Sequence, residues 1–306
     1  MRPLGTGLCL LLALAGAPLG GCRGRGGAEV PEDPARQRVR LFWDKLHAAN
    51  EARLRPDCRT AVGLYQQALK LQPHHEDALY YLGQCRRELG EPQAARTAFE
   101  RLVEANPSSA RGHLALGALL ASPDPREPMD LAAAELHLRR AHALNGEETG
   151  PVVRLGEAAL VSGRGAEARE WFEAALRTNP KSVEAAFLAG FVAWDAGARD
   201  VPRLVRRVRT ASEFVAPVKG VLSEGDRKDL KRVAAPPLES PLGKLLFGAP
   251  IAALRGRAAA GAEIDEATVV QLWREARGLK TAFATRAAAR PTPAAAGIIG
   301  RGGQRP

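Results

Sequence analysis

The histidines and acidic residues of this chain do not form a pattern that could carry out catalysis. Six histidines are spread between His47 and His142, and the one adjacent pair, His74 and His75, follows Pro73 in a turn. The sequence contains no Gly-x-Ser-x-Gly nucleophile motif, no glycine-rich phosphate loop and no His-Glu-x-x-His zinc motif. It also has no Cys-x-x-Cys pair or Cys/His cluster for zinc or redox chemistry. We therefore expect no catalytic residues, no metal and no cofactor.

A repeated spacing organises this chain of 306 residues. Gly83, Gly117, Gly156 and Gly190 are separated by 34, 39 and 34 residues, and each follows a leucine or an alanine. Apolar residues follow three of these glycines at matching offsets: Ala95, Phe99 and Leu102, then Ala134, Leu138 and Ala141, then Ala168, Phe172 and Ala175. The pattern resembles the tetratricopeptide repeat over roughly residues 41–209.

The resemblance implies an all-α fold: a right-handed tetratricopeptide-repeat solenoid of about five helical pairs, with a helical C-terminal extension. Two helices approach closely only where side chains are small, which gives the repeated glycines a packing role. One pair cannot bury its apolar face alone, so neighbouring pairs must stack. In the fifth unit Pro202, Arg206 and Arg209 replace small or apolar residues, which predicts a divergent terminal unit with a polar outer face.

Cys58 and Cys85 are candidates for a disulfide. Cys58 lies near the start of the second helix of one unit, and Cys85 lies late in the first helix of the next. Those helix ends are neighbours in an antiparallel stack, so a disulfide is geometrically possible in an oxidising compartment. The alternative is that both cysteines are small buried apolar residues at helix contacts, and the sequence does not decide between the two.

The first residues of the chain indicate export. Arg2 precedes an apolar run from Leu8 to Ala15, which is too short to span a bilayer and fits a secretory signal. The segment Leu-Gly-Gly-Cys that ends at Cys22 resembles the lipobox of bacterial lipoproteins. This implies that residues 1–21 are a signal peptide and that Cys22 is lipidated. The alternatives are signal cleavage after Ala17 without lipidation, and a cytosolic chain with a leucine-rich start.

The lipobox resemblance also implies a location in the bacterial cell envelope. A lipid anchor would hold the protein at the membrane. Arg23 is not the aspartate that directs inner-membrane retention, so we expect the periplasmic face of the outer membrane. Residues 22–40 are rich in glycine, proline and charge, which predicts a flexible tether.

The net charge of +10 raises the question of nucleic-acid binding, because the basic residues are concentrated towards the C-terminus. Nearly all of these residues are arginines in an alanine- and glycine-rich chain, which is typical of a compositional bias. Export would also separate the protein from nucleic acid. We therefore expect no nucleic-acid partner.

The predicted solenoid extends over residues 41–214, and the repeat pattern stops beyond it. Residues 215–264 are predicted to be a loop-rich linker with short helices, in which Gly248-Ala249-Pro250 interrupts a helix over 241–260. Residues 265–290 are predicted to form an amphipathic capping helix, and residues 291–306 a disordered tail. The apolar face of that helix would comprise Val269, Leu272, Trp273, Ala276, Leu279 and Phe283. This face must find a partner, and the helix either caps the solenoid or lies in its groove.

The first helices of such repeats line a concave groove, and the resemblance implies that partners bind there. The residues predicted to form this partner-binding groove are Tyr80, Tyr81, Gln84, Arg87, Val153, Glu157, Phe187, Phe191 and Trp194. The groove lacks the Lys/Asn/Arg pattern that some members of the family use to clamp a C-terminal carboxylate. The remaining mode is an extended peptide or a helix laid on a partly aromatic groove.

The sequence thus predicts a membrane-anchored protein–protein interaction scaffold, for example in the assembly of an envelope or secretion complex. One alternative is an enzyme or a non-catalytic subunit whose site lies in the C-terminal third. Another is a periplasmic spacer that associates with itself. The sequence fixes neither the partner nor the oligomeric state, because the repeat serves many pathways.

Overall fold

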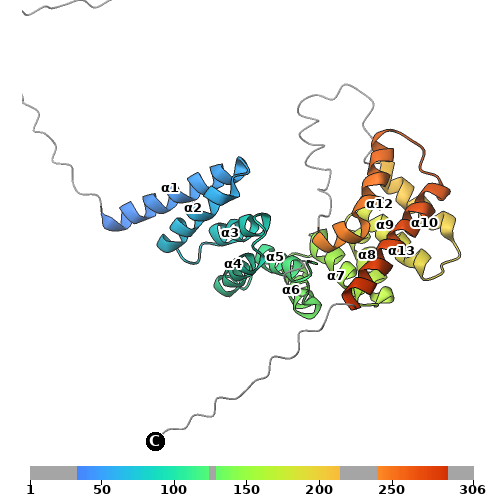
Figure 1. The fold of residues 1–306 in the computed structure, drawn as a ribbon, viewed down its shortest axis with the longest axis horizontal. Coiled ribbons are helices and arrows are strands. Elements are labelled where there is room, and N and C mark those ends of the chain that lie inside the picture. The colour runs from blue at the N-terminus through green and yellow to red at the C-terminus, as the bar shows by residue number, and fades with distance from the viewer. Residues whose placement is uncertain (1–32, 124–128, 214–239, 289–306) are drawn as a thin grey trace, which may run out of the picture.

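The computed structural model describes residues 33–123, 129–213 and 240–288. The predicted signal peptide, the lipidation residue Cys22, most of the tether, much of the linker and the C-terminal tail lie outside these residues. Within them the secondary structure is helical throughout, in twelve α-helices. The helices follow one another as a row of pairs, and the last two fold back over the end of that row (Figure 1).

The row consists of five pairs of antiparallel helices, as expected. In each pair a first helix is joined by a short turn to a second helix. The pairs are α1 (Pro34–Leu54) with α2 (Cys58–Leu71), α3 (Glu76–Glu88) with α4 (Pro92–Ala105), α5 (Ala110–Leu120) with α6 (Leu131–Leu144), α7 (Thr149–Val161) with α8 (Gly165–Thr178), and α9 (Val183–Asp195) with α10 (Val201–Glu213). The chain is therefore a helical solenoid of tetratricopeptide type, as the repeat pattern predicted.

Short polar side chains and glycines set the ends of these helices. Ser109 and Ser182 cap α5 and α9, because each hydroxyl accepts a hydrogen bond from the backbone N–H three residues later. Gly90 and Gly163 follow α3 and α7 with φ values of 72° and 77°, in the left-handed region that favours glycine. The tight turn between the two helices of a pair depends on this conformation.

A repeated contact between a glycine and a large side chain holds each pair together. A Cβ atom added at Gly117 would lie 2.8 Å from Leu138, and one added at Gly156 would lie 2.5 Å from Phe172. Gly83 makes the same contact with Phe99. Phe99, Leu138 and Phe172 are at most 1 % exposed. The recurring columns of the sequence are thus the interior of each pair.

The first helix begins earlier than the sequence indicated. We predicted a tether through residue 40, but α1 starts at Pro34, with the Asp33 carboxylate accepting a hydrogen bond from the Ala35 N–H. Proline suits the first turn of a helix, where its missing N–H would have no partner in any case. The proline and charge of this segment are therefore a helix start and a solvated helix surface rather than a linker.

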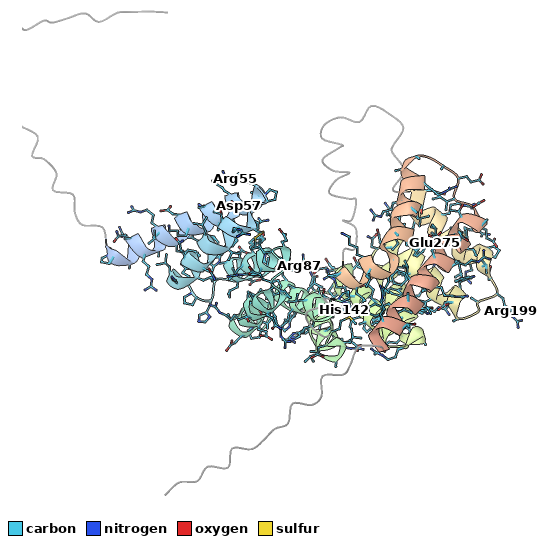
Figure 2. The ribbon with its side chains drawn as sticks, viewed as in Figure 1. Arg55, Asp57, Arg87, His142, Arg199 and Glu275 are labelled. Carbon is cyan, nitrogen blue, oxygen red and sulfur yellow. A yellow bond between two sulfur atoms is a disulfide. The ribbon has the colours of Figure 1, made fainter. Side chains whose placement is uncertain are left out.

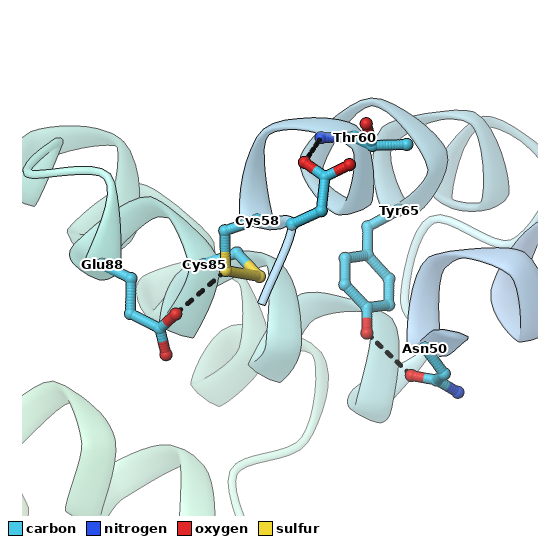
Figure 3. Close-up of a disulfide and its surroundings, with 7 residues drawn as sticks. Asn50, Cys58, Thr60, Tyr65, Cys85 and Glu88 are labelled. Atoms are coloured by element: carbon cyan, nitrogen blue, oxygen red, sulfur yellow. Dashed lines mark hydrogen bonds between the residues drawn. A yellow bond between two sulfur atoms is a disulfide. The ribbon is translucent and has the colours of Figure 1, made fainter. Parts of the chain in front are cut away.

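A disulfide joins the first two pairs. Cys58 at the start of α2 and Cys85 in α3 are bonded, with their Cα atoms 5.0 Å apart, and the Glu88 carboxylate lies 3.1 Å from the Cys58 sulfur (Figure 3). Of the two possibilities that the sequence left open, the structure has the bonded form. A cross-link that closes a loop of this size contributes about 3 kcal/mol, mainly by restricting the unfolded chain.

Two further helices form the C-terminal extension, which we call the C-terminal hairpin: α12 (Pro241–Ala259) and α13 (Glu266–Ala288). The predicted interruption at Gly248-Ala249-Pro250 is wrong, because α12 runs through Pro250. Leu242, Leu246, Pro250, Leu254 and Ala258 recur every four residues and are all buried. Burial of this stripe offsets the roughly 3 kcal/mol that an internal proline costs.

The hairpin also completes the fifth pair. Arg206 occupies the column of Phe99 and Phe172, and it is exposed, so α10 offers no large side chain to Gly190. Trp273 of α13 fills that place, and a Cβ added at Gly190 would lie 2.5 Å from its ring. The predicted apolar face of α13 is buried at every position given for it except Leu279, which is 36 % exposed.

No helix among the residues in these three ranges is long and apolar enough to cross a membrane.

We predict that Gly190→Ala lowers the free energy of unfolding by about 1–3 kcal/mol, because the new methyl group would overlap the Trp273 ring. Urea unfolding followed by circular dichroism measures the change. The same substitution should cost less in a Trp273→Ala background, where the ring is absent.

Gly63→Ala is the matched control, since a Cβ at this helical position meets nothing within 4 Å. It should be neutral or stabilise by about 0.5–1 kcal/mol. Equal destabilisation by the two alanines, or an unchanged cost of Gly190→Ala in the Trp273→Ala background, would contradict this account of the fifth pair.

Candidate functional site

The predicted groove residues divide into two groups in the structure. Val153, Glu157, Phe187 and Phe191, on α7 and α9, are at most 2 % exposed, and Trp194 is partly buried. We call these five residues the closed section. Tyr80, Tyr81 and Gln84 of α3 are half-buried, and Arg87 is exposed at the carboxyl end of the same helix (Figure 2). We call these four residues the open section.

The prediction that the closed section binds a partner is wrong for this structure, because the C-terminal hairpin covers it. Phe247 of α12 packs edge-on against Phe191, with ring centroids 5.4 Å apart. Trp273 stacks on Trp194 at 5.9 Å and donates a hydrogen bond from its indole N–H to the Phe187 carbonyl, 3.2 Å away. The aromatic side chains that suggested a binding groove are therefore core residues.

A short chain of hydrogen bonds fixes the start of α12 to the groove. The Gly243 N–H donates to Ser240 Oγ at 2.7 Å, and the Ser240 hydroxyl donates in turn to the Glu157 carboxylate. Burial raises the pKa of Glu157 to about 7, against the opposing effect of the Ser240 hydrogen bond. Glu157 therefore anchors the helix start, and its charge state changes close to neutral pH.

Ion pairs hold the rest of the hairpin. Arg255 of α12 pairs with the buried Glu184 at the start of α9. Asp195 at the end of α9 accepts a hydrogen bond from Arg277 at 2.6 Å and another from Lys280. Burial alone would raise the pKa of Asp195, but these two bonds lower it. The carboxylates on α9 are thus matched by bases on the hairpin.

These contacts assign separate roles to the two helices of the hairpin. The sequence left open whether the last helix caps the solenoid or lies in its groove. In the structure α13 packs on α9 and α10 at the solenoid end, whereas α12 lies over α7 and α9. A cavity of 380 Å³ remains between α12 and those helices, lined by apolar residues with Glu184, Lys244 and Arg255 at its edge. The helix in the groove is the one predicted to be an interrupted linker helix.

The open section combines tyrosine rings with guanidinium groups. Arg53 of α1 stacks over the Tyr81 ring, with its guanidinium carbon 4.1 Å from the centroid, and Arg111 of α5 stacks over Tyr80 at 4.4 Å. The Gln84 side chain donates a hydrogen bond to the Tyr80 hydroxyl at 3.0 Å. Each stacked arginine keeps the N–H groups of its planar fork available to an acceptor.

Carboxylates of α3 hold one of these arginines. Arg111 lies 2.5 Å from Asp77 and 3.3 Å from Glu76, and Glu76 also accepts hydrogen bonds from Asn106 and Ser109. Burial would lower the pKa of Arg111, but Asp77 and Glu76 raise it. This cluster joins the second pair to the third.

The sequence analysis missed several residues of this surface. Arg53, Arg111 and Arg154 were not predicted as groove residues, although Arg53 follows Ala49 by the same four positions that separate Arg87 from Gly83. His113 and His137 were treated as scattered, yet their Nδ1 atoms lie 2.9 Å apart and burial lowers the pKa of both rings. Repeat position would have found Arg53, whereas the histidine contact depends on the insertion in the third pair.

The residues that the structure places do not gather three or more histidine, cysteine or acidic side chains into a possible metal site. The polar side chains of the C-terminal hairpin that contact α7 and α9 are engaged in the pairs described above. What the described surface offers is a binding face of stacked arginines and tyrosines.

Comparison with known proteins agrees with the geometry. A family model described as "Tetratricopeptide repeat" matches residues 48–110, 86–122 and 153–200. A crystal structure of MamA protein is 22 % identical with a TM-score of 0.53, over 60 % of this chain and 99 % of that one. The ArsTM double mutant of MamA RS-1 is 16 % identical with a TM-score of 0.50, over 57 % and 94 %.

The structure of PilF from Pseudomonas aeruginosa is 19 % identical with a TM-score of 0.49, over 82 % of this chain and 99 % of that one. No curated protein matches the chain. The likeness to MamA shows the fold alone.

We predict that Glu157→Gln removes part of the pH dependence of stability. The folded-state pKa of about 7 exceeds the ordinary value of 4.5, so the folded chain binds this proton more tightly than the unfolded chain does. The resulting stabilisation is complete below about pH 4.5 and is lost as the pH rises to about 7, by up to about 1.4 kcal/mol per pH unit. Glutamine stays neutral and can still accept the Ser240 hydrogen bond.

Urea midpoints at pH 5 and pH 8 measure this effect. The Glu157→Gln variant should be more stable than the wild type at pH 8, and the difference should shrink at pH 5. Glu170→Gln, an exposed carboxylate on α8, is the control and should follow the wild type at both pH values. A Glu157→Gln variant that is less stable than the wild type at pH 8 would show that the buried carboxylate is charged and needed.

Proposed function

Because the chain is a tetratricopeptide-repeat protein, we propose that it is a non-catalytic scaffold that holds a segment of another protein against the open section. Proteins with this repeat generally act as interaction scaffolds. The observation that carries the proposal is the division of the groove: α12 and α13 cover α7 and α9, while the tyrosines and Arg87 of α3 remain accessible. An extended segment or a helix can lie on such a surface.

The division also explains why the partner does not use the more apolar half. An incoming segment at the closed section would have to displace Trp273 and Phe247, which are fully buried, and break the Asp195 ion pairs. At the open section it would displace only water. The accessible surface is therefore the working surface.

We propose further that the scaffold is a lipoprotein tethered to the bacterial envelope through Cys22, on the periplasmic face of the outer membrane. The support is the apolar run before residue 16 and the Leu-Gly-Gly-Cys segment that ends at Cys22. The Cys58–Cys85 disulfide is in keeping with an oxidising compartment. A role in assembling an envelope or secretion complex would follow from this location.

We predict that Tyr80→Ala/Gln84→Ala reduces the amount of the bound partner at least tenfold in a pull-down from native membranes with the full chain. The two substitutions remove the ring and the amide that a partner would contact. Circular dichroism and the melting temperature would establish that the variant remains folded, since Tyr80 also packs on Phe99.

The control variant is Leu136→Ala/Gln66→Ala, which removes an exposed apolar side chain and an exposed glutamine from second helices. It should retain the partner at the wild-type level. If the groove variant and the wild type retain the same proteins, or if no form retains any, the proposal that this section binds a protein fails.

We predict that Cys22→Ala abolishes incorporation of a labelled fatty acid and moves the protein from the membrane fraction to the soluble fraction. Lipidation at Cys22 is the only membrane attachment in the proposal. Cys9→Ala is the control, because it changes a cysteine within the proposed signal peptide. Equal labelling of the Cys22→Ala variant would refute the lipid anchor and leave the scaffold proposal intact.

A further inference from the structure

Four successive first helices each place one arginine at the open section or its border. They are Arg53 of α1, Arg87 of α3, Arg111 of α5 and Arg154 of α7, and we call them the arginine ladder. Arg53 and Arg111 stack on the two tyrosines, and Arg87 extends from the end of α3 (Figure 2). Four cations on one concave surface favour an anionic partner.

Only one rung of the ladder is neutralised by a nearby carboxylate. Arg111 is paired with Asp77 and Glu76. Arg53, Arg87 and Arg154 form no ion pair with any residue that the structure describes, and Arg53 Nε is buried without a hydrogen-bond partner there. A buried N–H group without a partner costs about 1–3 kcal/mol, which an incoming acceptor could recover.

Arg154 stands at the border between the open and closed sections, in a setting that is unfavourable for a cation. Burial lowers its pKa, and the charge of Arg87 lowers it further. Glu157 and Glu148 act in the opposite sense, but the Glu157 carboxylate is buried and accepts the Ser240 hydrogen bond. The unfavourable proximity of Arg87 and Arg154 would be relieved by an anion bound between them.

The ladder also has a spacing that an extended chain can match. Arg53 and Arg87 lie at the same repeat position, four residues after Ala49 and Gly83, on first helices of adjacent pairs. Packed helices are about 10 Å apart, and an extended peptide covers about 10 Å in three residues. Two carboxylates about three residues apart could therefore meet these two guanidinium groups.

We propose that the segment bound by the open section is an extended acidic peptide, whose carboxylate side chains pair with Arg53, Arg87 and Arg154. This inference rests on the proposed scaffold function and adds the chemical class of the partner. The tyrosine rings contribute apolar contact beneath the peptide, and the charge pairs set its register. Exposed ion pairs are screened by salt, so binding should weaken as the ionic strength rises.

A direct test uses the full chain and a fluorescein-labelled 12-residue peptide with glutamate at every third position among glycine and serine. The control peptide has glutamine at those positions. Fluorescence anisotropy at low salt should show at least tenfold tighter binding of the glutamate peptide. Raising the salt from about 50 to about 300 mM should weaken binding several-fold. Equal binding of the two peptides would overturn the proposal.

Arginine variants locate the binding. Arg53→Gln/Arg87→Gln/Arg154→Gln should weaken binding of the glutamate peptide at least tenfold. The control, Arg59→Gln/Arg177→Gln/Arg274→Gln, removes the same charge from exposed positions elsewhere and should change binding less than twofold. Equal losses in the two variants would show a general charge effect and refute the ladder. Melting temperatures would establish that both variants are folded.

Two further arms separate this inference from other readings. Vesicles of phosphatidylcholine with phosphatidylglycerol test an anionic membrane, and ladder-dependent binding to them without binding of the peptide would overturn the proposal. In the membrane pull-down, excess glutamate peptide should release the partner that Tyr80→Ala/Gln84→Ala fails to retain. If that partner stays bound, the acidic-peptide inference fails while the scaffold function stands.

Discussion

The solenoid depends on one contact: two helices approach closely at a glycine, and a large side chain of the second helix fills the space beside it. Phe99, Leu138 and Phe172 make this contact in the three central pairs. The contact sets the distance between the helices of a pair, and hence which residues of the first helix face the groove. At Gly190 the ring comes from Trp273 of a helix 83 residues further on. The same constraint therefore shapes the regular repeats and explains why the C-terminal hairpin must dock.

Local pattern in the sequence was enough to predict the pairs, their order and the amphipathic last helix. Each depends on residues that repeat at fixed spacing. It was not enough to predict α12 as one helix or as the cover of the groove. Pro250 argues against a continuous helix when it is considered alone, and only burial against α7 and α9 reverses that judgement. Long-range packing outweighs local preference at this position.

The candidate site shows the same limit in a different way. Phe187 and Phe191 look like a binding surface because they lie on the groove face of a first helix. They are core residues because another part of the chain covers them. The arginines of the open section were the less visible signal, since in an arginine-rich chain each one resembles a solvated surface residue. Their stacking on Tyr80 and Tyr81, and the scarcity of nearby carboxylates, give them meaning only in three dimensions.

The long separation between Gly190 and Trp273 has a consequence for the order of folding. The first four pairs bury their own contacts within about 40 residues of chain, so they can form soon after each pair is released from synthesis or translocation. The fifth pair must wait until residue 273 has emerged. Until then Phe187 and Phe191 face water, and the half-finished chain has an exposed apolar surface at one end. Assembly of this solenoid is therefore directional, and its last step is the one most in need of protection from aggregation.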